Sequence, residues 1–204
     1  MVVNCSMNRQ GEIGELIKAV GTFSEFAEIR FRDINADYEV ARDIDAVVLS
    51  GSKARIVEAP HRKLFKETVE LIKRLDRPKL GICYGYQLVC WSLGCKVASL
   101  AEPVIDRFEN VRVLEADEIF QGFEEYQTVL LAQSHNDYVV KNSLDSAGFV
   151  LLADSSSCEV EAVKHRNGAF YGVQFHPERT KIKNRVCREG HTIIKNFFRN
   201  IVKR

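Results

Sequence analysis

The chain carries a cysteine where a thiol could act as a nucleophile. Cys83 lies in GICYGYQLVCWSLG, residues 81–94, between a short apolar run and a pattern typical of a helix. A thiol at a strand-to-helix turn lies at the carboxyl edge of the sheet, where open α/β folds bind ligands, and the helix N-terminus favours its thiolate form. Gly81 and Gly85 permit the tight backbone that such a turn needs. Taken alone, this pattern is equally typical of a buried structural thiol.

A histidine and a carboxylate late in the chain supply the other groups that thiol chemistry requires. A nucleophilic cysteine needs a base, and the base needs a third group to orient it. In YGVQFHPE, residues 171–178, an apolar run ends at His176, Pro177 stops a strand from continuing, and Glu178 follows. His176 alone would be typical of a strand-end histidine with satisfied hydrogen bonds. Together with Cys83, it predicts a Cys83–His176–Glu178 triad.

The elements that must position these residues alternate in the first half of the chain, which is typical of parallel strands joined by crossover helices. We expect strands at 1–4, 27–31, 46–49 and 79–82, and helices at 12–20, 62–75 and 87–93, the last capped by Gly94. Later strands are expected at 111–114, 128–132, 149–153, 159–164 and 170–175, with a hairpin turn at 165–168 and a final helix at 192–202. The predicted fold is α/β, an open and mostly parallel sheet with flanking helices plus a β-rich C-terminal half, with residues 1–204 as one domain.

Composition argues against several classes of protein. The 29 Lys and Arg residues nearly balance the 28 Asp and Glu residues, so neither a nucleic-acid nor a membrane-surface partner is expected. We expect a cytoplasmic protein, because the sequence shows no export signal and no apolar run of about 18 residues. The cysteines, at positions 5, 83, 90, 95, 158 and 187, form no CxxC pair and the histidines no HxxxH pair, so reduced thiols and no metal site are predicted.

The stretches GICYGYQ and GVQFHPE resemble the two signature motifs of the class I, triad-type glutamine amidotransferases, whose fold is flavodoxin-like. In that family a cysteine attacks the side-chain amide of glutamine, ammonia leaves, and water hydrolyses the thioester to glutamate. The resemblance implies that glutamine is the substrate and Cys83 the nucleophile. His176 would be the general base and acid, and Glu178 the carboxylate that orients it.

The same resemblance assigns contacts to the substrate. The backbone amide of Tyr84 matches one oxyanion donor, and Gln87 matches a substrate-contacting glutamine. The family's second donor comes from a Ser-Gly-Gly-Pro turn, which corresponds here to LSGSKARI, residues 49–56; Gly51 matches and Ser52 departs. Serine keeps its amide but disfavours positive φ, so the loop's backbone decides whether that amide can face the site.

A further segment narrows the resemblance. QSHNDYV, residues 133–139, resembles a Ser-His-x-Asp-x-Val segment of the glutaminase part of GMP synthase, and ADEIFQGF and EVEAVKH fit the same subgroup, whereas the N-terminal VVNCSMNRQGE departs from it. On this resemblance Ser134, His135 and Asn136 line the end of the site that holds the α-amino and α-carboxylate groups of glutamine. Asp137 would lie near a synthetase interface. Without the resemblance, SHND, residues 134–137, is typical of a polar turn after a strand.

The acceptor of the ammonia is the most open part of the sequence interpretation. The sequence shows no Gly-rich phosphate loop and no second domain for ATP chemistry. The resemblance therefore implies an ATP-pyrophosphatase-type synthetase partner that activates xanthosine monophosphate (XMP) and binds ATP and Mg²⁺, with no cofactor in this chain. Lys53 and Arg55 are interpreted as solvated loop residues, the alternative being an interface contact. Three other functions stay open: an amidotransferase for another acceptor, a standalone γ-glutamyl hydrolase, and a non-catalytic regulatory relative.

Overall fold

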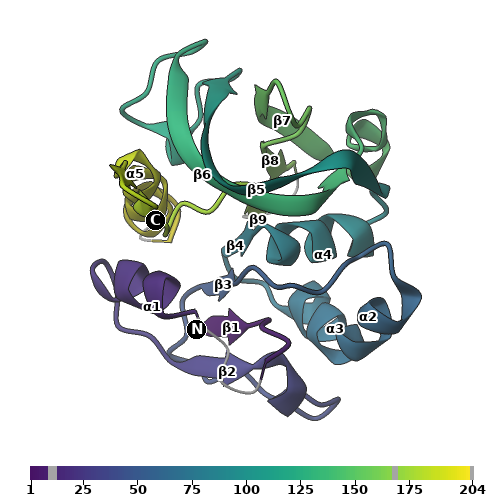
Figure 1. The fold of residues 1–204 in the computed structure, drawn as a ribbon. Helices are drawn as coiled ribbons and strands as arrows, with labels where there is room; N and C mark the ends of the chain where they lie inside the picture. The colour runs from purple at the N-terminus through teal and green to yellow at the C-terminus, as the bar shows by residue number, and fades with distance from the viewer. Residues whose placement is uncertain (9–12, 167–169, 203–204) are drawn as a thin grey trace.

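The computed structural model describes residues 1–8, 13–166 and 170–202. Within these residues one nine-stranded sheet runs through the molecule in the order β2-β1-β3-β4-β9-β8-β7-β5-β6 (Figure 1). Its first five strands are parallel to one another: β2 (Glu28–Arg30), β1 (Val2–Asn4), β3 (Val47–Leu49), β4 (Lys79–Ile82) and β9 (Phe170–Val173). Strands β1, β3 and β9 are buried along their whole length, which is why they are short apolar runs.

The remaining strands are antiparallel and form the β-rich half that the sequence predicts. They are β5 (Val97–Val113), β6 (Thr128–Val139), β7 (Phe149–Ser155) and β8 (Ala162–His165). Figure 1 shows β5 and β6 curving together as a long pair. The pairing shifts register on both sides of Val104, and such irregularities bend a strand. A separate two-stranded sheet joins β10 (Lys181–Ile182) and β11 (Arg185–Val186).

Helices cover both faces of the sheet, and each face has its own apolar core. Helix α1 (Gly14–Gly21) packs on one face with α5 (Glu189–Asn196) and the π-helical segment 197–202 that continues it. The other face holds α2 (Ala59–Leu64), α3 (Lys66–Arg74) and α4 (Tyr84–Ser92). Short 3₁₀ turns complete the chain at Phe31–Asp33, Glu118–Phe120, Lys141–Ser143 and Asp145–Ala147. The architecture is therefore α/β, as the alternating sequence pattern predicts.

Several predicted boundaries are wrong for identifiable reasons. The helix expected at 62–75 is interrupted at Phe65, whose backbone leaves the helical region while its buried ring stacks on Phe31. The helix expected at 87–93 begins three residues earlier, directly after Cys83. Gly94 has a φ of 106°, as a capping glycine requires. The helix expected at 192–202 begins at Glu189 and becomes a π-helix from residue 197.

The β-rich half differs more from expectation. The stretch 111–114 falls at the end of the 17-residue strand β5, and 128–132 is only the first part of β6. The polar segment 134–137 is therefore strand, and its interpretation as a turn is wrong. Of the stretch 159–164, only the part from Ala162 is strand. Strands β8 and β9 pair antiparallel, as the predicted hairpin requires, but part of its turn, like the start of the helix expected at 12–20, lies outside the described residues.

Two general features concern the whole described chain. All six cysteines are free thiols and are buried. Among the described helices, none has both the length and the apolar character needed to cross a bilayer.

Candidate active site

Cys83 occupies a strained turn between β4 and α4. Its backbone has φ 49° and ψ −109°, a region that non-glycine residues rarely adopt. The Cys83 N–H donates to the Val173 carbonyl over 2.8 Å, and the Cys83 carbonyl accepts from the Gln87 N–H over 3.0 Å. These bonds hold the turn in place, and strain of this kind is concentrated at functional sites. The thiol is consequently fixed at the first turn of α4, where the backbone N–H groups have no acceptor within the helix.

The helix after this turn approaches the sheet closely because residue 85 has no side chain. A Cβ on Gly85 would lie 2.6 Å from the main-chain oxygen of Leu49 in β3. Any larger residue would push α4 away from the sheet. The second glycine of the GICYG motif therefore sets the position of the helix that begins beside the nucleophile.

His176 and Glu178 follow β9, which is the strand next to β4. The His176 Nδ1 lies 2.8 Å from the Glu178 Oε1, and both side chains are largely buried. The His176 N–H donates to the Ala132 carbonyl, which ties this segment to β6. Burial lowers the pKa of His176, but the charges of Glu178 and Cys83, together with hydrogen bonds to both, raise it well above the ordinary value. The arrangement favours the protonated, imidazolium form of His176.

The loop at residues 50–56 passes next to this pair. A Cβ on Gly51 would lie 2.9 Å from the His176 Cε1 and 3.6 Å from the Cys83 Cβ, so only glycine fits without a shift. Neither Gly51 nor Ser52 has a positive φ. The backbone at Ser52 is therefore one that serine adopts without strain, and its hydroxyl accepts a hydrogen bond from the Ala54 N–H over 3.1 Å.

A cavity of about 350 Å³ opens beside the thiol. Apart from Gly51, it is lined by all the residues that the sequence assigns to substrate binding: Ser52, Tyr84, Gln87, Ser134, His135 and Asn136. Gly51, His176 and Glu178 line an adjoining cavity of about 860 Å³, which shares Ser52, Lys53 and Ser134 with the first. The smaller cavity has the size of a small-molecule site, and Cys83 forms part of its wall.

Two glutamines connect the thiol to β6. The Gln87 side-chain amide donates to the Asp137 main-chain oxygen over 2.7 Å and to the Gln174 Oε1 over 3.0 Å. Gln174 in turn donates to the Cys83 Sγ over 3.6 Å. Both amide hydrogens of Gln87 are therefore used within the protein, so only its oxygen is left for a ligand. Sequence reasoning missed Gln174, although a polar residue inside the apolar run YGVQF was a usable signal.

Arg55 is not the solvated loop residue that the sequence interpretation favours. Its Nη2 lies 2.6 Å from the Asp137 Oδ1 and 2.7 Å from the Ser99 Oγ. Asp137 is only 3% exposed, whereas the Arg55 side chain is 34% exposed. Of the two charged groups, Arg55 is thus the one available to a partner, and Asp137 holds it in place.

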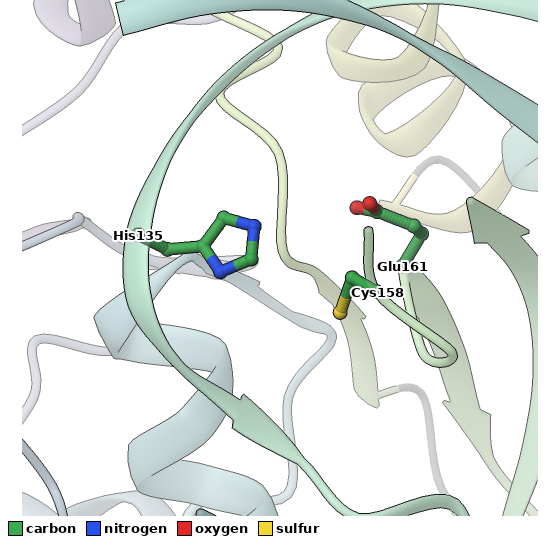
Figure 2. A group of neighbouring side chains, drawn as sticks. All are labelled: His135, Cys158 and Glu161. Carbon is green, nitrogen blue, oxygen red and sulfur yellow. The ribbon is translucent and has the colours of Figure 1, made fainter. Parts of the chain in front are cut away.

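Alternate residues of the predicted substrate segment, 133–137, face opposite sides of strand β6. Gln133, His135 and Asp137 are buried, while Ser134 and Asn136 between them are more exposed, as the two-residue period of a strand requires. The Cys83 thiol donates to the Ser134 carbonyl over 3.7 Å. The His135 ring, by contrast, points toward Cys158 and Glu161 in the interior (Figure 2).

Comparisons with known proteins find a matching family and several similar chains. The family description "Glutamine amidotransferase class-I" matches residues 12–201. One subunit of the glutamine-hydrolysing GMP synthase of Methanothermobacter thermautotrophicus is 36% identical over 162 residues, which are 79% of this chain and 77% of that protein. The corresponding GMP synthase subunit of Sulfolobus acidocaldarius is 31% identical over 161 residues, 79% of each chain.

Longer relatives and solved structures extend the comparison. The GMP synthase of Streptococcus thermophilus is 33% identical over 184 residues, which cover 89% of this chain but 32% of that protein. The chain thus spans about a third of that relative. A solved structure from Thermoplasma acidophilum, described as a GMP synthase subunit, superimposes with a TM-score of 0.79 over 97% of this chain and 90% of that one. At 23% identity, this likeness concerns the fold.

Proposed function

The chain belongs to the class I glutamine amidotransferase family, and from that premise we propose that it releases ammonia from glutamine and passes it to a synthetase subunit for GMP synthesis. The observation that carries the proposal is the position of Cys83. Its thiol lies on a strained turn, at the wall of a small-molecule-sized cavity and next to the His176–Glu178 pair.

In the proposed reaction, the Cys83 thiolate attacks the side-chain carbonyl carbon of glutamine, and the carbonyl electrons move to oxygen. The Tyr84 N–H at the start of α4 and an amide of the loop carrying Gly51 and Ser52 would stabilise that oxyanion. The His176 imidazolium then gives its proton to the leaving nitrogen, so that ammonia departs and a thioester remains. Neutral His176 next takes a proton from water, which attacks the thioester and releases glutamate and the thiolate.

Glu178 and the β6 segment have supporting roles in this proposal. The Glu178 carboxylate accepts from the His176 Nδ1 and so aims the other ring nitrogen at the sulfur and the leaving group. Ser134 and Asn136 are proposed to hold the α-amino and α-carboxylate groups of glutamine, with the backbone of His135 between them. Gln87 would contact the substrate through its remaining oxygen.

The two relatives that are themselves GMP synthase subunits support a separate synthetase partner, because this chain and those proteins cover most of each other's length. The partner we propose is of the ATP-pyrophosphatase type and binds XMP, ATP and Mg²⁺, while this chain binds glutamine without a catalytic cofactor. Its docking would cover the cavity mouth and keep ammonia from solvent. Residues 1–204 would act as one domain, in the cytoplasm.

The decisive experiment measures ammonia release from glutamine by the purified chain, alone and with a GMP synthase synthetase subunit, XMP, ATP and Mg²⁺. We expect release to rise sharply only in the full mixture, together with GMP. The Cys83→Ala variant should lose release in every mixture, whereas Cys90→Ala, which changes a cysteine buried within the same helix, should keep it. Full activity of the chain alone would instead identify a standalone hydrolase. Ammonia release without GMP would point to another acceptor. No ammonia release in any of the mixtures would point to a non-catalytic relative.

A further inference from the structure

Three potential metal ligands of different chemistry meet in the interior of the protein. His135 comes from β6, Cys158 from the segment after β7, and Glu161 from the residue before β8 (Figure 2). One nitrogen, one sulfur and one carboxylate oxygen of these residues all lie within 4.8 Å of one another. The three residues are 5%, 3% and 0% exposed, so water does not surround them.

Two atoms of this group have no hydrogen-bond partner among the described residues. They are the Nε2 of His135 and the Oε2 of Glu161. Leaving such atoms unpaired inside a protein costs about 1–3 kcal/mol each. Both side chains are nevertheless well anchored on their other side, so their direction is set by the protein.

The anchoring contacts are those that metal ligands usually have. The His135 Nδ1 lies 3.2 Å from the Asp137 carbonyl, and donation to that oxygen leaves the Nε2 lone pair free. The Glu161 Oε1 accepts from the Gln133 amide over 2.8 Å and from the Ser155 hydroxyl over 2.7 Å. Each side chain therefore presents one open electron pair.

Burial disfavours a charge on each of these three side chains. Burial lowers the pKa of His135 to about 4, which keeps its imidazole neutral. Burial also raises the pKa of Glu161 to about 7 and that of Cys158 well above its ordinary value. A thiolate, a carboxylate and a neutral imidazole carry two negative charges together, and a divalent cation would balance them.

We propose that His135, Cys158 and Glu161 bind one zinc ion, which fastens β6 to the segment between β7 and β8. Sulfur and imidazole donors favour zinc over magnesium or calcium. Ligands at zinc distances of about 2.0–2.3 Å lie roughly 3.3–3.8 Å apart in a tetrahedron, so binding requires a group that spans up to 4.8 Å to contract by roughly 1.0–1.5 Å. The Gln133 Oε1, which also has no partner among the described residues, or a water would complete the four ligands.

The zinc ion would act as a brace for the substrate cavity. Ser134, Asn136 and Asp137 are strand neighbours of His135 and line that cavity. This proposal revises the sequence expectation of no metal site. No ligand spacing was visible, because residues 135 and 158 are distant in the chain. The pairing of β6 with β5, of β5 with β7 and of β7 with β8 brings them together.

The test measures metal binding by the full chain carrying Cys83→Ala, so that zinc bound at the catalytic thiol does not count. After treatment with a chelator, the protein is titrated with Zn²⁺ in equilibrium dialysis, and separately with Co²⁺ as a spectroscopic probe. We expect one ion per chain and a near-ultraviolet thiolate-to-cobalt charge-transfer band. Adding Cys158→Ala should abolish that band and weaken zinc binding by more than about 100-fold, beyond the 10–100-fold typical of losing an outer-shell contact. Adding Cys90→Ala, the loss of another buried thiol, should change neither.

A second variant keeps the test decisive if Cys158→Ala does not fold. Glu161→Gln preserves the acceptor for Gln133 and Ser155 but removes the charge, so it should weaken zinc binding at least tenfold while the cobalt band persists. Zinc should also raise the melting temperature of the Cys83→Ala chain, and less so with Glu161→Gln. The absence of bound zinc and of the cobalt band in the Cys83→Ala chain would overturn the proposal. The proposal would also be overturned if Cys158→Ala or Glu161→Gln left the zinc affinity of the Cys83→Ala chain unchanged.

Discussion

The substitution Gly51→Ala tests whether the loop at 50–56 is fitted to the catalytic pair. The backbone at Gly51 has no positive φ, so alanine adds no backbone strain there. Its methyl group would, however, lie 2.9 Å from the His176 Cε1 and 3.6 Å from the Cys83 Cβ. The effect is therefore purely steric and falls directly on the proposed base.

The size of the effect follows from that distance. Carbon atoms pack at about 3.5–4.0 Å, so relieving a 2.9 Å contact moves the ring or the loop by roughly 0.6–1.1 Å. A misplacement of about 1 Å at a catalytic group costs about 100-fold in rate. We accordingly expect kcat to fall about 100-fold, which corresponds to roughly 2.7 kcal/mol in the barrier. KM should change little, because Gly51 does not line the smaller cavity.

The assay is steady-state glutamine hydrolysis in the full synthetase mixture, with circular dichroism and melting temperature as measures of folding. Gly14→Ala is the matched control, because no atom of the residues that the structure describes lies within 4 Å of the methyl group it would add. It should keep wild-type kcat. A folded Gly51→Ala protein with kcat within about threefold of wild type would refute the steric reasoning, because a 1 Å displacement predicts a far larger loss.

Three further predictions concern the charge pairs and the packing of the site. Glu178→Gln removes a charge that raises the pKa of His176, so kcat/KM should fall about 10²- to 10⁴-fold. The alkaline limb of the pH profile of kcat/KM should also shift to lower pH, and an unchanged limb would contradict the role of the His176–Glu178 pair. The raised pKa of His176 also contributes to stability: the contribution is full below pH 6.5, the pKa in the unfolded chain, and is lost as pH rises through the pKa of the folded protein. Denaturation at several pH values should therefore show a weaker dependence of stability on pH in Glu178→Gln than in the wild type. Arg55→Ala leaves the buried Asp137 carboxylate without its ion-pair partner and should lower the free energy of unfolding by about 2 kcal/mol. This is below the roughly 3–5 kcal/mol of a fully buried pair, because Arg55 is partly exposed. A double-mutant cycle with Asp137→Asn measures the coupling energy between the two side chains, and additive effects would contradict the prediction. Gly85→Ala places a methyl group 2.6 Å from the Leu49 carbonyl oxygen in β3 and should lower the free energy of unfolding, measured by denaturant titration, by about 1–3 kcal/mol. Unchanged stability would mean that α4 can shift freely.

The elements around the nucleophile were predictable because their signals are local. The strand at 79–82 was predicted with the bounds that β4 has, and the apolar run at 170–175 contains β9. The break at Phe65 was not predictable, because the periodicity of 62–75 continues through it and only the packing of Phe65 against Phe31 separates α2 from α3. The extension of β6 through polar residues was missed for a related reason: its partner β5 supplies the hydrogen bonds, and a polar composition alone resembles a turn.

The amino-acid sequence was enough to establish the α/β alternation and the residues whose chemistry resembles a glutaminase. These features rest on short motifs, in which an apolar run, a glycine and a reactive side chain occur within a few positions of one another. The family membership depends on the same motifs and on similarity along most of the chain.

Which distant side chains meet depends on the folded chain. The contacts of Gln87 with Gln174 and of Arg55 with Asp137 join residues more than 80 positions apart. His135 reaches Cys158 and Glu161 because the two-residue period of β6 turns its side chain inward. Strand register sets which side chains face inward, and register is a property of the paired strands rather than of either one alone.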